Sequence, residues 1–317
     1  MGQPNVRLNP KIDSTRSRVL LGKAVELLFS CVLLLPEQTI KTGRGRKPYD
    51  YRIILALSIL RTLLGQRYAD YETVLRVNPV IQAKLGLKKM PCKSTLNNYD
   101  LHVFTMYLLV RVNKMLVRDW IKKPVDLALD ASGIQLVGRS IWFNIRTKKN
   151  IRKKDCDKVH IATSLCSLLI TDFVITNSKR NDSPFLRVLL KSYKVLGIVL
   201  ADKGYSNKTN ALFVTKKKGA FFSPFKTNAV ASGLDAWAYM KRLWSVFGQM
   251  CYNIYHKRNC VEAVFSALKR KYGDSLHCKI WHSRRREMAM RFIAYNVRII
   301  VGIQIAREKN IPLWVRA

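Results

Sequence analysis

Two aspartates each close an apolar stretch of the sequence. "VDLALD" ends at Asp130 and "GIVLAD" ends at Asp202, in a chain that has 57 Lys and Arg but only 20 Asp and Glu. If the two stretches are neighbouring parallel strands, both carboxylates emerge at the carboxyl edge of one sheet, where open α/β sheets place their sites. Such carboxylates can hold a hard divalent cation, although a single acid at a strand end more often caps a helix. The matching contexts favour a shared role for the two aspartates.

Glu262 is the candidate for a third carboxylate, because glutamate is rare after residue 123. It lies in "YHKRNCVEAVFSALKRKYG", residues 255–273, whose apolar spacing predicts an amphipathic helix. At about 100° per residue, one face spanning roughly 60° presents Tyr255, Arg258, Glu262 and Lys269. An apolar stripe of Val261, Val264, Phe265 and Leu268 borders that face. The face is either a solvated surface with Arg258 and Glu262 paired four residues apart or part of a site beside the two aspartates.

The elements that must position these acids follow from the pattern after residue 123. β-rich apolar runs at 125–138, 158–177 (two strands around a turn), 195–202 and 219–225 predict strands. A helix at 183–193 separates the third strand from the fourth, and 233–307 is mainly helical. This order predicts an α/β sheet with a helical layer. The densest charge run, residues 146–154, is expected in a loop or hairpin tip.

The first 123 residues have helical spacing almost throughout. Pro91 breaks the chain, and we expect Ser94 to cap a long helix that begins there and runs to about residue 116, with Thr95 and Asn97 in its first turn. Short helices, a tight break and a polar helix start are typical of a helix-turn-helix reader of DNA, although any helical bundle has such corners. The segment 121–126 then joins two domains, 1–123 and 124–317.

The net charge of +37 is spread along the whole chain rather than held in one tail. A folded protein with this charge repels itself unless a polyanion neutralises it, so we expect a nucleic-acid partner whose binding weakens as salt rises. Composition alone does not separate DNA from RNA.

The seven cysteines form no C-x-x-C pair, which argues against a zinc site or a disulfide framework and favours a reducing compartment. The most apolar early stretch, residues 19–36, contains Lys23 and Glu26 and follows a polar leader. It therefore predicts a core helix rather than a signal or membrane-spanning segment.

The spacing Y-x2-R-x3-E-x6-K, met by the four residues of the face described above, resembles the signature of insertion-sequence DDE transposases. "DKGY" at 202–205 resembles the second-aspartate motif of that family, and "DASGI" at 130–134 resembles the first. "RNDSPFLRVLL" at 180–190 is similar to the segment between them. With the N-terminal segments 45–65 and 92–96, the resemblance covers about residues 45–273.

The resemblance implies a ribonuclease-H-like mixed sheet with helices, preceded by an all-helical N-terminal DNA-binding domain. It implies that Asp130, Asp202 and Glu262 hold two Mg²⁺ (or Mn²⁺) ions, with Asp130 shared, so that a water exposes the 3′-OH of the element and this hydroxyl attacks target DNA. Residues expected to contact the nucleic acid are Tyr255, Arg258, Lys269, Lys203, Ser94, Thr95 and Asn97. The implied partner is double-stranded DNA, bound by a homodimer in the nucleoid-containing cytoplasm of a prokaryote.

The large β insertion that some relatives carry before the glutamate has no room here, because only 60 positions separate Asp202 from Glu262. Two other functions stay open. One is a catalytically inactive DNA-binding remnant or repressor, and the other is a metal-dependent nuclease of the same fold that cuts without joining.

Overall fold

The computed structural model describes residues 6–37, 48–87, 89–136 and 156–316. Contacts divide the chain into two compact units, Met1–Leu116 with Ile280–Ala317, and Val117–Lys279. The sequence grouped 124–317 together, whereas the last long helix clusters with the N-terminal helices. The assignment of 1–123 to DNA binding and of 124–317 to catalysis stays a prediction.

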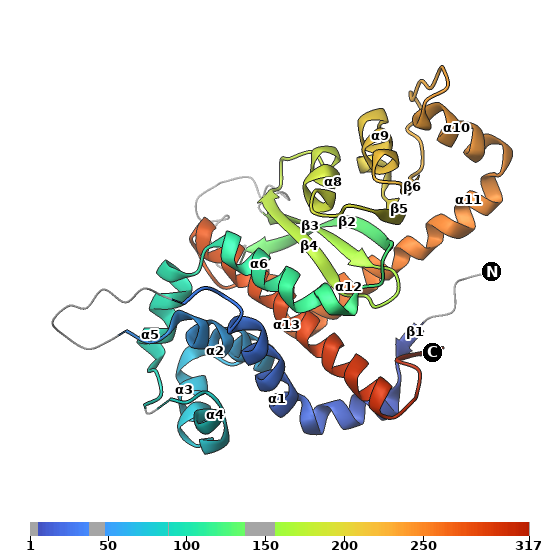
Figure 1. Cartoon of the computed structure of the whole chain (residues 1–317). Coiled ribbons are helices and arrows are strands. Elements are labelled where there is room, and N and C mark those ends of the chain that lie inside the picture. The colour runs from blue at the N-terminus through green and yellow to red at the C-terminus, as the bar shows by residue number, and fades with distance from the viewer. Residues whose placement is uncertain (1–5, 38–47, 88, 137–155, 317) are drawn as a thin grey trace, which may run out of the picture. The chain divides into compact units, whose positions relative to one another are not determined.

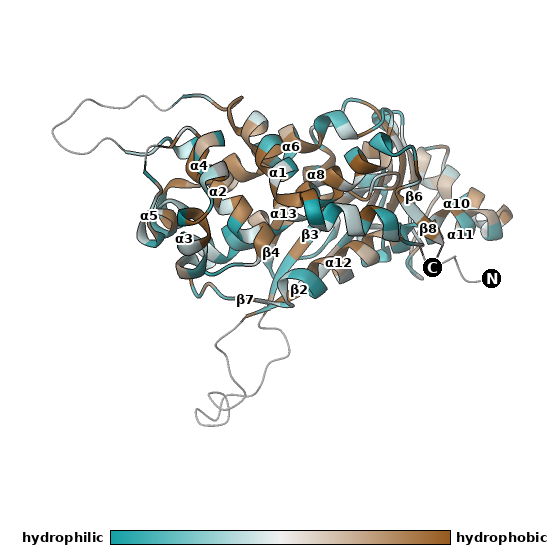
Figure 2. Cartoon of the chain, turned by 90° about the horizontal axis from the view of Figure 1, so that it is seen from below, coloured by the Kyte–Doolittle hydropathy of each residue, from teal (hydrophilic) through white to brown (hydrophobic). Residues whose placement is uncertain are grey.

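The first unit is helical, as its sequence pattern predicts. Its α-helices are α1 (Pro10–Val32), α2 (Tyr51–Leu64), α3 (Tyr68–Arg76), α4 (Pro79–Lys84), α5 (Lys93–Asn98), α6 (Met106–Val117) and α13 (Trp281–Glu308) (Figure 1). A short antiparallel pair joins β1 (Val6–Leu8) to β8 (Trp314–Arg316). Helices α1 and α2 both pack on α13, and Figure 2 shows apolar residues along α2 and α13.

Helix α13 is long and apolar enough to cross a membrane by length and composition, the one such helix among the described residues. However, 83% of its apolar window is buried inside the protein, as in a core helix. The stretch 19–36 likewise contributes buried side chains from α1, among them Ala24, Val25 and Leu28, which agrees with the core helix predicted there.

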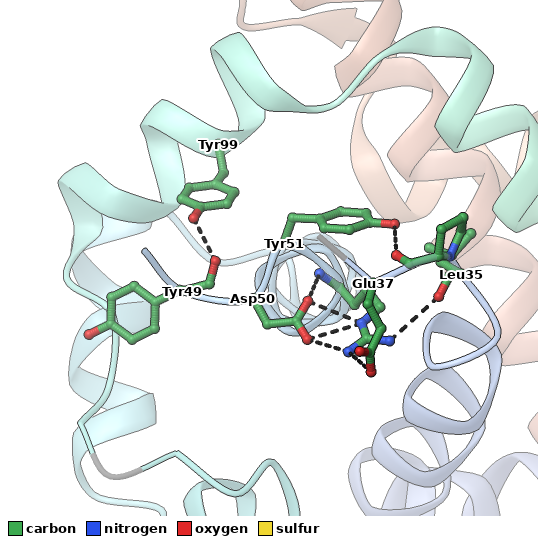
Figure 3. A network of polar contacts seen from close by, with 8 residues as sticks. Leu35, Glu37, Tyr49, Asp50, Tyr51 and Tyr99 are labelled. Carbon is green, nitrogen blue, oxygen red and sulfur yellow. Dashed lines mark hydrogen bonds and ion pairs between the residues drawn. The ribbon is translucent and has the colours of Figure 1, made fainter. Parts of the chain in front are cut away.

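A polar network holds the start of α2 against the end of α1 (Figure 3). Asp50 caps α2 by accepting a hydrogen bond from the backbone N–H of Arg52 at 2.8 Å. The guanidinium of Arg52 pairs with Asp50 at 2.7 Å and with Glu37 at 3.2 Å, and the Tyr51 hydroxyl donates to the carbonyl of Pro36 at 2.7 Å. The network therefore satisfies donors at the beginning of α2 and fixes the chain just after α1.

The long helix predicted from Ser94 to about residue 116 is wrong in two respects. Helix α5 begins at Lys93 with Cys92 as its N-cap residue, so Ser94 lies inside the first turn and does not cap it. After a π-helical turn at Tyr99–Val103 the helix is interrupted, and the Thr105 hydroxyl accepts a hydrogen bond from the N–H of Leu108 at 3.1 Å. A threonine cap thus starts α6 as a separate helix.

The second unit is built on a mixed sheet. Its strands run in the order β4 (Ile170–Asn177), β3 (Cys156–Ser164), β2 (Val125–Leu136), β5 (Leu196–Ala201) and β6 (Ala220–Phe222), with β7 (Ser275–Leu276) pairing β2. Strand β3 is antiparallel to both of its neighbours, β2 and β4, while β5 is parallel to β2 and β6 is parallel to β5. The expected ribonuclease-H-like mixed sheet is therefore confirmed. The charge run at 146–154 lies outside the described residues.

Helices complete this unit: α8 (Ser183–Leu190), η3 (Lys203–Tyr205), α9 (Lys208–Lys216), α10 (Ala236–Val246), α11 (Gly248–Tyr255), η4 (His256–Arg258) and α12 (Asn259–Tyr272), with η2 (Arg118–Trp120) before the sheet. Alternate residues of β2 point to opposite faces. Leu127 and Leu129 pack with Leu186 and Leu189 of α8 and with Val214 of α9 in one buried cluster. The even-numbered residues of β2, including Asp130, therefore belong to the other face, and α12 also contacts this strand.

Gly219, just before β6, has no room for a side chain. A Cβ there would lie 2.8 Å from the Leu196 Cβ and 2.9 Å from a Val214 methyl. We expect Gly219→Ala to destabilise the protein by about 1–3 kcal/mol, because the tightly packed neighbours must shift. Urea unfolding checks this, with Gly248→Ala as the control, since a Cβ at Gly248 would meet nothing within 4 Å. Equal stability of the two variants would contradict the packing described.

Candidate active site

Asp130 and Asp202 lie side by side on neighbouring strands, Asp130 in the middle of β2 and Asp202 directly after β5. Strands β2 and β5 pair in parallel, with Leu129 opposite Ala201. The next residue on β2 is Asp130, and the next residue after β5 is Asp202, so backbone pairing brings the two carboxylates together. The sequence predicted this proximity, but it placed Asp130 at the end of its strand, whereas β2 continues past Asp130 to Leu136.

Arg258 connects Asp130 to Glu262. Its Nη1 lies 3.2 Å from Oδ2 of Asp130, and its Nη2 lies 2.6 Å from Oε1 of Glu262. The Arg258 side chain is 12% exposed and that of Glu262 is 54% exposed. The guanidinium therefore reaches from the solvent-facing Glu262 inward to the less exposed Asp130.

Tyr255 connects the same group to Asp202. Its hydroxyl donates to Oδ1 of Asp202 at 3.5 Å, and the Arg258 guanidinium carbon lies 5.7 Å from the centre of its ring. The arginine and the tyrosine thus link all three predicted acids. Three of the four residues of the face predicted from the sequence, Tyr255, Arg258 and Glu262, therefore contact one another or the two aspartates, and the pairing of Arg258 with Glu262 is one of these contacts.

The helix that carries this face is not continuous from 255 to 273, as the sequence predicted. Helix α11 ends at Tyr255, a 3₁₀ turn covers His256–Arg258, and α12 begins at Asn259. A 3₁₀ turn rotates by about 120° per residue rather than 100°, so helical phase alone does not set the orientation of Tyr255. Within α12 the expected apolar stripe is confirmed, because its buried residues are Val261, Val264, Phe265 and Leu268.

The electrostatics of the cluster favour a cation beside Asp130. Burial raises the pKa of the Asp130 carboxyl, the charge of Arg258 opposes this, and the charges of Asp202 and Glu262 raise it further. For Arg258, burial acts to lower the pKa, but the neighbouring carboxylates and Tyr255 outweigh it and the pKa is raised. The carboxylates of Asp130, Asp202 and Glu262 lie close enough to repel one another, so their ionised forms need positive charge nearby.

The donor types at this edge fit a divalent metal, since carboxylate oxygens are the ligands that Mg²⁺ prefers. Among the residues that the structure describes, no group of three or more His, Cys, Asp or Glu side chains could hold a metal ion as arranged. Of the three predicted ligands, Asp130 and Glu262 both pair with the guanidinium of Arg258. Asp130 and Asp202 remain adjacent, and Glu262 is held to them through the arginine.

The other predicted contact residues are less constrained. Lys203 is exposed in η3, directly after Asp202, and Lys269 is half-buried on α12. Neither lysine forms an ion pair with a residue in the described ranges. Ser94, Thr95 and Asn97 lie on α5 in the other compact unit, so their predicted role in DNA reading stays a prediction.

The turn that carries Asp202 is supported by residues that the sequence did not single out as a group. The backbone carbonyl of Asp202 accepts hydrogen bonds from the N–H of Tyr205 at 2.9 Å and from the hydroxyl of Ser223 at 3.1 Å. The buried Tyr205 hydroxyl bonds to Nδ1 of His160 at 3.0 Å, and His160 stacks on Phe185. His160 is thus a packing residue that holds Tyr205, and the sequence signal for the turn was the tyrosine of "DKGY".

The sequence matches the family model described as "Transposase DDE domain" over residues 121–297, more than half of the chain. No curated protein matches it. Among solved structures, the chain is similar to one described as the cryo-EM structure of a piggyBac transposase synaptic complex with hairpin DNA. The two share 10% identity and a TM-score of 0.45, over 94% of this chain and 75% of that one. A similarity of this size carries no conclusion about function.

The ion pair between Arg258 and Asp130 can be tested in the metal-free protein. Because the arginine lowers the pKa of Asp130, Arg258→Gln should raise that pKa above its already elevated value. Titration of the carboxyl carbon signals of labelled aspartate by NMR measures the change. Arg270→Gln, an exposed arginine of the same helix, is the control and should leave the titration of Asp130 where it is. An unshifted Asp130 in the Arg258 variant would show that the two side chains are not paired in solution.

Proposed function

Since the chain belongs to the transposase DDE domain family, we propose that it cleaves DNA at the ends of an insertion sequence and joins the freed 3′-OH to target DNA. The observation that carries the proposal is the cluster in which Arg258 and Tyr255 connect Asp130, Asp202 and Glu262 beside the paired strands β2 and β5. Acids are scarce in this basic chain, and three of them meet at one place.

Asp130, Asp202 and Glu262 are the proposed ligands of two Mg²⁺ or Mn²⁺ ions. Bound there, the ions would supply Lewis-acid stabilisation of the attacking and leaving oxygens of a phosphodiester. Asp130 is best placed to be shared between them, because it lies nearest the middle of the cluster, adjacent to Asp202 in the sheet and joined to Glu262 by Arg258. Glu262 is the most accessible of the three and reaches the cluster from α12.

Arg258 is proposed to exchange partners when DNA enters. A guanidinium that donates to two carboxylates can instead donate two parallel hydrogen bonds to two oxygens of one phosphate. If Arg258 left Asp130 and Glu262 to bind a backbone phosphate, both carboxylates would become free to bind metal as the DNA arrives. Lys269 and Lys203 would add phosphate contacts, and Tyr255 would pack against the DNA near the cleaved end while its hydroxyl keeps Asp202 in position.

The wider partners follow from charge and from the reaction. A net charge of +37 fits double-stranded DNA as the polyanion that relieves self-repulsion in the folded protein. Ser94, Thr95 and Asn97 of α5 are proposed to contact that DNA. Bringing two element ends together requires two copies of the site, so we propose a homodimer assembled on DNA. Its setting would be the nucleoid-containing cytoplasm of a prokaryote.

Asp202→Asn should keep DNA binding and lose metal-dependent cleavage by at least a hundredfold, because an amide binds a hard cation far more weakly than a carboxylate does. Cleavage of a duplex carrying the element ends, in Mg²⁺ and in EDTA, measures this. Asp274→Asn, at an exposed position of the same unit, is the charge-matched control and should cleave as the unaltered protein does. Cleavage that survives in the Asp202 variant would remove Asp202 from the site.

The products of the same reaction separate the competing functions. Joined strands support the transposase. Cleavage without joining supports a nuclease of the same fold, and salt-sensitive binding without cleavage supports an inactive DNA-binding remnant.

A further inference from the structure

A basic hollow lies in the second unit, apart from the acid cluster. It has a volume of about 790 Å³, and the residues that give it its character are Gly133, Lys158, Lys179, Arg180, Asp182 and Lys226. Four of these side chains are cationic and one is acidic. The proposed reaction assigns no role to any of them.

The hollow opens on the other face of the sheet from Asp130. Gly133 lies three positions beyond Asp130 on β2 and pairs with Lys158 of β3. Successive residues of a strand point to opposite faces, and three positions span about 10 Å. A ligand in the hollow would therefore be near the acid cluster along the strand without touching it.

Three of the four cations of the hollow have no carboxylate partner in the part of the chain that the structure describes. Lys158 is paired, with its Nζ 2.5 Å from Oδ1 of Asp182. Lys179, Arg180 and Lys226 are exposed and form no ion pair with any residue in the described ranges. Three uncompensated cations around one concave surface concentrate positive potential there, which attracts an anion with several charged oxygens.

The hollow is built onto the turn that carries Asp202. Asp182 packs so closely on Gly204 that a Cβ at Gly204 would lie 3.0 Å from Oδ2 of Asp182. Oδ1 of the same carboxylate is 3.7 Å from Nδ1 of the buried His160, which holds Tyr205. Gly204 itself lines the hollow. Asp182 thus fixes Lys158 on one side and the Asp202 turn on the other.

We propose that this hollow binds backbone phosphates of the DNA on which the acid cluster acts, away from the scissile bond. The inference rests on the proposed function. Phosphate contacts carry no base information, so the hollow sets the position and direction of the duplex at the cluster rather than its sequence. Arg180 and Lys226 are the principal contacts, and Lys158 is held in place for the same phosphates by Asp182.

The double variant Arg180→Ala with Lys226→Ala tests the hollow through the salt dependence of binding. The probe is a 20-base-pair duplex of arbitrary sequence, followed by fluorescence anisotropy between 50 and 200 mM KCl in EDTA, so that no cleavage contributes. Loss of two phosphate contacts should lower the slope of log K against log salt by about 2 and weaken binding at 0.1 M salt roughly 10- to 100-fold.

The control removes the same charges from the far end of α8, by Arg187→Ala with Lys191→Ala, both exposed. Its slope should equal that of the unaltered protein. An unchanged slope in the hollow variant, an equal loss in both variants, or an unaltered protein that binds no duplex would each overturn the inference. If the double variant fails to fold by circular dichroism, Lys226→Ala alone should lower the slope by about 1, and an unchanged slope in that single variant would likewise overturn the inference.

Failure of this inference and failure of the proposed function give different results. Metal-dependent cleavage by the unaltered protein together with an unchanged slope in the hollow variant rejects the hollow and keeps the function. A reduced slope in the hollow variant from a protein that cleaves no element end keeps the hollow as a DNA site and rejects the function.

Discussion

The parallel pairing of β2 with β5 is the constraint on which the candidate site depends. Hydrogen bonds between these strands place Leu129 opposite Ala201, and the side-chain alternation of a strand then sends Asp130 to the face on which Arg258 approaches. A shift of one residue in this register would turn Asp130 toward the buried leucines of α8. The backbone thus sets the geometry of the acids, and the side chains around them adjust to it.

Charge balance is the second requirement. Three carboxylates close together around Asp130 repel one another, and burial together with this repulsion raises the pKa of Asp130. Arg258 offsets the repulsion by pairing with Asp130 and Glu262. The same guanidinium is the group best suited to a phosphate. In the proposed reaction, exchange of the partners of Arg258 would link DNA entry to exposure of the acids.

Contacts from Tyr205, Ser223 and Asp182 hold the turn after β5 in shape. Tyr205 and Ser223 bond the carbonyl of Asp202, and Asp182 packs against Gly204. These contacts use buried or partly buried groups, which exclude water from the base of the turn. Asp202 in this turn belongs to the acid cluster, and Gly204 in the same turn lines the basic hollow. A ligand in the hollow would therefore contact the turn that holds Asp202.

Several features were readable from the sequence because they depend on local chemistry: the apolar strands that carry Asp130 and Asp202, the apolar stripe of α12, and the excess of positive charge that favours a polyanionic partner. The strand end placed at Asp130 was wrong, because β2 continues past it to Leu136. Others were not, because they depend on contacts between residues far apart in the chain. The 3₁₀ turn at His256–Arg258 breaks a helical phase that spacing alone extends, and the interruption before α6 depends on a threonine cap that competes with helix continuation. The sequence by itself determined which residues could carry the chemistry. Only the tertiary structure decided that Arg258 lies between Asp130 and Glu262, and that Asp182, Lys158 and Gly204 meet in one hollow, because strand register and packing alone bring such distant residues together.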